Sequence, residues 1–148
     1  MLLKASIIEP NIFRYCSKLV QLKIPTSIFL IGDYSFNYCS SLIKISIPSS
    51  VTIIEEGAFC KCLGLMEITI PSTVTIINKN VFYGCESLKR IIIPSSVTAI
   101  NKAAFCRCSS LEEVEIPSSV FSIGEKAFQG CKSLKKITIP SSVVLIKD

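Results

Sequence analysis

Residues 42–64 read LIKISIPSSVTIIEEGAFCKCLG, and the chain repeats this pattern on both sides with a period of 23 residues. Three residue types mark the period: proline at Pro25, Pro48, Pro71, Pro94, Pro117 and Pro140, cysteine at Cys16, Cys39, Cys62, Cys85, Cys108 and Cys131, and phenylalanine at Phe13, Phe36, Phe59, Phe82, Phe105 and Phe128. A fixed period of this length predicts a solenoid, because stacked coils share a core that no single coil could form.

The boundaries of the repeats follow from the leucine that opens each of them. Complete repeats cover residues 19–41, 42–64, 65–87, 88–110 and 111–133, and we call them coils 1 to 5. A partial coil precedes them at residues 1–18, and a second partial coil, coil 6, follows at residues 134–148. We therefore expect one repeat domain that covers residues 1–148.

Each coil contains the same succession of local patterns, which coil 2 illustrates. Apolar residues alternate with polar ones over residues 42–47, which predicts a half-buried strand that ends at Pro48. A serine-rich turn follows, and the apolar segment after it is a candidate for a second short strand. The spacing of Ala58, Phe59 and Cys62 then predicts one turn of α- or 3₁₀-helix, with the phenyl ring and the thiol turned inward.

The strand positions between the core residues are predicted to face outward. We call this surface the strand face, and its members are Gln21, Lys23, Lys44, Ser46, Glu67, Thr69, Arg90, Ile92, Glu113, Glu115, Lys136 and Thr138. The coils differ most at these positions, which favours a ligand-binding face. The alternative is an ordinary solvated surface with cross-strand charge pairs such as Glu67–Arg90.

Composition and charge narrow the possible partners. Hydrophobic residues make up 49% of the chain, yet no apolar run reaches the roughly 18–20 residues that cross a bilayer, so we expect no membrane insertion. The net charge of +5 is spread along the chain without a block of like charge, so we expect no nucleic-acid partner. Residues 1–8 are too short, and charged too early at Lys4, for a secretory signal. The chain is therefore either intracellular or an excerpt of a longer, exported protein.

The cysteines are predicted to be structural. The pairs at Cys60 and Cys62 and at Cys106 and Cys108 are separated by one residue, which is not the usual spacing of a zinc site, and the chain has no histidine. We therefore expect no metal and no cofactor, and buried free thiols along the period. The alternative is disulfides between adjacent coils, which the coil spacing allows but which parallel stacked side chains suit poorly. Cys60 and Cys106 lie off the period, so we expect them to be more exposed and more reactive.

Catalysis is not expected. Without histidine, no Ser/His or Cys/His pair can form. The adjacent carboxylates Glu55 and Glu56 would point in opposite directions from an extended segment, so they would not converge on one substrate atom.

The repeat L-x-x-I-x-I-P-S-S-V-x-x-I-x-x-x-A-F-x-x-C-x-S resembles the BspA-like leucine-rich repeat of surface proteins from mucosal bacteria and protozoan parasites. The resemblance covers about residues 8–148, and in coil 2 it rests on Leu42, Ile45, Ile47, Pro48, Val51, Ile54, Ala58, Phe59 and Cys62. One period later the same positions match, except that Val81 replaces the alanine. It implies an α/β leucine-rich-repeat solenoid dominated by β-structure: a right-handed, curved stack of six parallel strands with short helical or 3₁₀ turns.

The resemblance also implies a function without catalytic residues. It implies an adhesin at the cell surface or secreted, which binds a host surface or matrix protein through the strand face. The alternative is an intracellular or self-assembling scaffold, because the strand of residues 134–139 would leave an unpaired edge for end-to-end association. The chain shows neither a signal nor an anchor, so a cytoplasmic location stays open as well.

Overall fold

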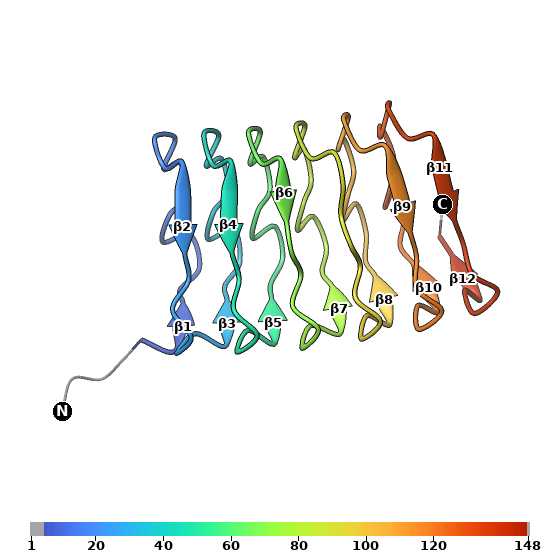
Figure 1. The fold of residues 1–148 in the computed structure, drawn as a ribbon, viewed down its shortest axis with the longest axis horizontal. Helices are drawn as coiled ribbons and strands as arrows, with labels where there is room; N and C mark the ends of the chain where they lie inside the picture. The colour runs from blue at the N-terminus through green and yellow to red at the C-terminus, as the bar shows by residue number, and fades with distance from the viewer. Residues whose placement is uncertain (1–4, 148) are drawn as a thin grey trace.

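The computed structural model describes residues 5–147, which form a solenoid of stacked coils with a strand order that follows the sequence repeats (Figure 1). Residues 1–4 and Asp148, which the predicted domain assigns to the terminal partial coils, lie outside the described residues. All regular elements of the described part are β-strands. The strands form two parallel ladders that run along the solenoid.

The first ladder contains the strand that opens each coil. Its strands are β2 (Gln21–Lys23), β4 (Lys44–Ser46), β6 (Glu67–Ile68), β9 (Glu113–Glu115) and β11 (Lys136–Thr138). The pairing shifts by one coil at each step, so that Leu22 lies beside Ile45 and Ile45 beside Ile68. Coil 4 joins this ladder only through isolated bridges, Thr69 with Ile92 and Arg90 with Glu113. The predicted parallel stack is therefore confirmed, with its fourth member reduced to bridges.

The second ladder confirms the second short strand. Its strands are β1 (Ile7–Ile8), β3 (Leu30–Ile31), β5 (Ile53–Ile54), β7 (Ile76–Ile77), β8 (Ala99–Ile100), β10 (Ser122–Ile123) and β12 (Leu145–Ile146). They pair in the orders β1-β3-β5 and β7-β8-β10-β12. In Figure 1 they lie along the lower side of the solenoid, below the strands of the first ladder.

The phenylalanines form a column through the core. Neighbouring rings lie 5.2 to 5.8 Å apart between centroids and are nearly parallel. The four central rings are completely buried: Phe36, Phe59, Phe82 and Phe105. Burying one such side chain contributes about 1.5–3 kcal/mol, so the column joins each coil to the next.

The predicted helical turn around each phenylalanine is wrong, and the backbone explains why. In coil 2 both Gly57 and Lys61 have positive φ angles, of 62° and 61°, which a right-handed helix does not allow. The N–H groups of Gly57 and Phe59 donate to Lys79 and Val81 of the next coil, at 2.9 and 3.0 Å. The segment therefore stacks on its neighbour through coil-to-coil hydrogen bonds and does not close a helix of its own.

Hydroxyls and thiols bond to carbonyl oxygens of the preceding coil. The Ser96 hydroxyl donates to the Val74 carbonyl at 2.6 Å, and equivalent bonds recur in other coils. The Cys62 thiol donates to the carbonyl of Phe36 at 3.1 Å, and each periodic cysteine from Cys39 to Cys131 makes the equivalent bond. All eight cysteines are free thiols. The periodic hydroxyls and thiols therefore hold the coils together, in addition to the strand pairing.

Candidate ligand-binding face

The first ladder places the strand-face residues together on one exposed surface. In β4 and β9 the middle residue is buried, and the residues on either side of it are exposed. At β2 and β11 the middle residue is partly buried, and all twelve predicted positions are exposed. The geometry therefore agrees with the predicted surface, and ligand binding by that surface stays a prediction.

The structure adds a third row to this face, which the sequence analysis missed. It consists of the residue directly after the opening leucine of each coil, and we call it the flanking row: Val20, Ile43, Met66, Lys89, Glu112 and Lys135. The N–H of Ile43 donates to Val20 at 2.9 Å and that of Glu112 to Lys89 at 3.1 Å, so the row is in register along the solenoid. Two exposed or partly exposed residues follow the opening leucine in each coil, one in the flanking row and one on the strand face. An alternating pattern assigns only every second residue to the exposed side, so it does not identify both.

The flanking row is apolar in the first three coils. The side chains of Val20, Ile43 and Met66 are 50%, 44% and 52% exposed, so they form an apolar stripe next to the strand positions. Beside it, Lys44 donates to Glu67 at 2.7 Å, and this hydrogen bond lowers the pKa of the Glu67 carboxyl. The predicted Glu67–Arg90 pair is wrong, because the carboxylate reaches back to the lysine of coil 2.

In coils 4 to 6, the strand face and the flanking row together carry charge in bands. Coil 4 presents two basic residues, coil 5 three acidic residues and coil 6 two basic residues: Lys89 and Arg90, then Glu112, Glu113 and Glu115, then Lys135 and Lys136. A single ion pair among residues 5–147 joins the bands, from Lys135 to Glu112 at 3.1 Å, and it lowers the pKa of Glu112. Within the same described range, the other five charged residues of these bands form no ion pair.

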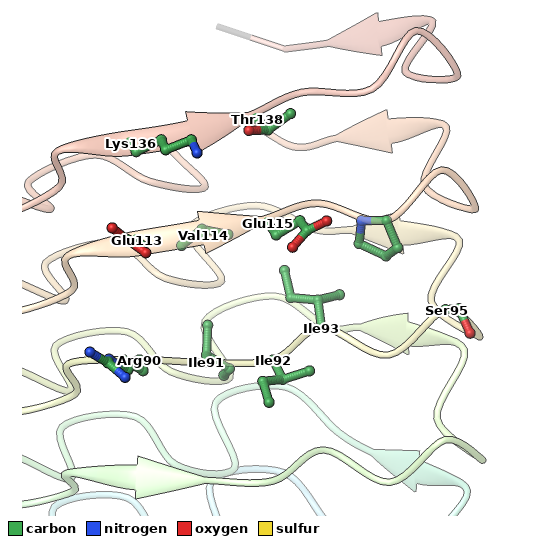
Figure 2. Close-up of a pocket in the computed structure, with 11 residues that line it drawn as sticks. Arg90, Ile91, Ile92, Ile93, Ser95, Glu113, Val114, Glu115, Lys136 and Thr138 are labelled. Atoms are coloured by element: carbon green, nitrogen blue, oxygen red, sulfur yellow. The ribbon is translucent and has the colours of Figure 1, made fainter.

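A groove of about 660 Å³ lies on these same three coils (Figure 2). Six strand-face residues line it: Arg90, Ile92, Glu113, Glu115, Lys136 and Thr138. Ile92 is 79% exposed, although its neighbours Ile91 and Ile93 are buried. The groove therefore combines an exposed apolar side chain with charges of both signs, and it lies where coil 4 has lost its regular strand pairing.

The predicted greater exposure of the cysteines off the period is confirmed for one of the two. Cys60 is half-buried, and Cys106 is only 4% exposed, so the expected exposure of Cys106 is wrong. Burial raises the pKa of both thiols, but it raises the pKa of the period thiols Cys62 and Cys85 well above the ordinary value, so the greater reactivity of Cys60 and Cys106 stays a prediction. In the described part of the chain, no group of three or more acidic or cysteine side chains lies in an arrangement that could hold a metal ion. Nor does any helix of residues 5–147 have the length and apolar character needed to cross a membrane.

Comparisons with known proteins place this geometry in context. The pattern of the BspA type leucine rich repeat region matches the chain in six copies, over residues 6–109 and 29–148. The crystal structure of the leucine rich repeat protein of T. pallidum is 31% identical, with a TM-score of 0.93, and the match covers 99% of this chain and 68% of that one. No curated protein matches the chain.

Two further solved structures are similar to this chain. A leucine rich cell surface protein from Faecalibacterium prausnitzii is 30% identical, with a TM-score of 0.69, over 90% of this chain and 42% of that one. A leucine-rich repeat protein from Bacteroides ovatus is 26% identical, with a TM-score of 0.71, over 98% of this chain and 44% of that one. This chain therefore spans less than half the length of these two relatives.

Proposed function

This chain belongs to the BspA type leucine rich repeat family, and we propose that it is a non-catalytic protein-binding module whose ligand occupies the strand face. The observation that carries the proposal is the contrast between core and face. The core column of phenylalanine repeats in every complete coil, whereas the exposed strand positions change from coil to coil. A solenoid whose coils share a core and vary on one exposed face is suited to recognising an extended protein surface.

The groove supports protein binding better than catalysis. Its charged side chains are exposed and of opposite sign, and they line the groove together with the exposed side chain of Ile92. Catalytic acids and bases are usually tuned by burial, which these groups lack. An apolar anchor with a polar rim is instead the arrangement that protein interfaces use.

We propose further that the module acts as an adhesin at the cell surface and that its ligand is a host surface or matrix protein. The support is the likeness to a leucine rich cell surface protein at 30% identity. Antibody labelling of intact source cells, with permeabilised cells as the control, tests this location. Labelling of intact cells is the expected result, and labelling only after permeabilisation would contradict it.

Binding of the purified chain to immobilised matrix glycoproteins tests the module itself. A variant with reversed charges at the groove, Arg90→Glu, Glu113→Lys, Glu115→Lys and Lys136→Glu, should lose at least about tenfold in affinity, because like charges would then face the ligand. The matched control reverses two exposed charges that follow the second ladder, Asp33→Lys and Lys147→Glu. Equal losses in both variants would contradict the proposal.

A second candidate function, a self-assembling scaffold, has one observation in its favour. A hollow of about 290 Å³ at the first described coil is lined mainly by apolar side chains, among them Ile8, Ile12 and Phe13. Another coil of the same repeat, supplied by a second copy, would cover these side chains. Proline at Ile137 in β11 should then reduce end-to-end association in sedimentation experiments, whereas the groove variant should not. The opposite pattern would leave only the binding module.

A further inference from the structure

The strand face and the flanking row change their chemistry halfway along the solenoid, while the coils stay in register. The flanking row is apolar at Val20, Ile43 and Met66, and it is charged at the next three coils. Hydrogen bonds between successive coils keep these residues in one line, so a ligand that follows the row passes from an apolar zone to a charged one. A ligand that covers the whole face must therefore have two zones of its own.

The charged zone specifies the order of charges that the ligand needs. Coils 4, 5 and 6 present basic, acidic and basic bands, and neighbouring coils of a parallel stack lie about 4.8 Å apart. Arg90, Glu113 and Lys136 form no ion pair with other residues of the described chain, so these groups are available to a partner. The complementary partner carries acidic, basic and acidic groups at nearly the same spacing.

The spacing favours a helix over an extended segment. Successive turns of an α-helix lie about 5.4 Å apart, so the helix drifts by only about 1.2 Å over two coil spacings. In an extended segment, side chains on one face are about 6.6 Å apart, so the drift over the same distance is about 3.6 Å. That drift is most of a coil spacing and would carry the last acidic group of the ligand past the basic band of coil 6.

We infer that the docking segment of the partner is an amphipathic helix that lies along the solenoid axis. Its apolar side chains cover Val20, Ile43 and Met66, and its next three turns carry acidic, basic and acidic side chains over coils 4, 5 and 6. An apolar side chain between the charged turns contacts Ile92 in the groove, in the manner of an interface anchor. Five coil spacings correspond to about 24 Å, or about 16 residues of helix. This inference rests on the proposed function, because it presumes that the strand face binds protein.

Selectivity is the property that this arrangement predicts. Exposed ion pairs add little affinity individually, but like charges placed opposite each other disfavour the wrong partner strongly. The apolar stripe and Ile92 then supply the contact area, and the bands fix the direction and register of the helix. A ligand with the exchanged charge order would meet three unfavourable bands.

Two labelled synthetic peptides of about 18 residues test the inference against the full chain by fluorescence anisotropy. Both carry leucines on one face of the first half. The complementary peptide has glutamates, lysines and glutamates on its last three turns, and the exchanged peptide has lysines, glutamates and lysines. We expect the complementary peptide to bind about tenfold more tightly and to gain helical circular dichroism when bound. Equal affinities, absence of binding by both peptides at millimolar concentration, or binding without added helix would overturn the inference.

A charge-inverted protein sharpens the test. Its six substitutions reverse six of the seven charges of the bands: Lys89→Glu, Arg90→Glu, Glu112→Lys, Glu113→Lys, Lys135→Glu and Lys136→Glu. None of these side chains belongs to the buried core, so the fold should survive, which far-ultraviolet circular dichroism checks. The variant should prefer the exchanged peptide, and an unchanged preference for the complementary peptide would overturn the inference.

The apolar half has its own test. Ile43→Lys places a charge in the middle of the apolar stripe and should weaken binding of the complementary peptide about tenfold. The variant should still prefer the complementary peptide to the exchanged one. Thr75→Lys, at the exposed position directly before β7 of the second ladder, is the matched control and should leave binding unchanged. Equal effects of the two substitutions would overturn the placement of the apolar half.

The two proposals fail in different ways. If the groove variant loses its matrix ligand but neither peptide binds the unmodified protein, the helix is wrong and the strand face is still the binding surface. If the groove variant and the control variant keep the matrix ligand equally well, the strand face itself is wrong.

Discussion

Coils 1 to 3 and coils 4 to 6 share one core and differ in surface and in strand pairing. In the first half, β2, β4 and β6 form a continuous sheet with an apolar stripe beside it. In the second half, coil 4 joins the sheet only by isolated bridges, and the surface carries bands of charge around a groove. A repeated skeleton therefore fixes where side chains lie, and the residues at the exposed positions decide what each half can bind.

The largest expected effect comes from interrupting the phenylalanine column, which runs through both halves, by a single substitution. Phe82→Ala removes a completely buried ring between Phe59 and Phe105 and should cost about 3–5 kcal/mol. We expect calorimetry to resolve two unfolding transitions, because the halves would lose their coupling. Phe13→Ala is the control, since Phe13 is partly exposed and stacks only on Phe36. A single, unshifted transition for Phe82→Ala would show that the column does not couple the halves.

The second effect concerns the thiols, which should behave alike in both halves. Burial raises the pKa of Cys39 in coil 1 and of Cys131 in coil 5 to about 11, from an ordinary value near 9. The folded state therefore holds the thiol proton more tightly. The contribution of these protonated thiols to the stability of the folded state is complete below about pH 9 and is lost as the pH rises through about 11.

Chemical unfolding at a series of pH values measures this loss. Cys39→Ala and Cys131→Ala should each reduce the slope of unfolding free energy against pH in that window. Slopes that match the unmodified protein in both variants would contradict the account of the thiols.

A smaller effect should separate the halves in amide hydrogen exchange. The amide of Ile45 lies in β4, which pairs with a strand on each side, whereas the amide of Ile91 lies where the ladder is reduced to bridges. Exchange at residues 90–93 should therefore be faster than at residues 44–46, because fewer strand contacts oppose local opening. Equal protection at both places would mean that the first ladder is continuous in solution.

The smallest effect is expected from the exposed ion pairs. Lys44→Ala and Lys135→Ala each remove one partner of a surface pair, in the first and second half respectively. Neither substitution should move the melting temperature measurably, because water and salt screen exposed pairs. A clear drop for one variant only would show that its pair has a structural role that its exposure does not indicate.

The sequence repeat predicts the skeleton well, because the period identifies the coil and the alternation identifies the inward side chains. It does not predict the local turn around Phe59. Lys61 has a positive φ angle there, and a lysine, unlike a glycine, gives no indication in the sequence that the backbone leaves the helical region. It also misses the flanking row, because Ile43 lies within the predicted segment of residues 42–47, where alternation does not mark it as outward-facing. The partner of Glu67 depends on how a long lysine side chain extends, and a strand pattern does not contain that information.

The most direct test of the central claim is a hydrogen–deuterium exchange footprint of the full chain bound to the first matrix glycoprotein that it captures. The account predicts added protection at the strand face and the flanking row, around residues 20–23, 43–46, 66–69, 89–92, 112–115 and 135–138, with no change along the second ladder. Protection centred on the second ladder, with the strand face unchanged, would contradict it.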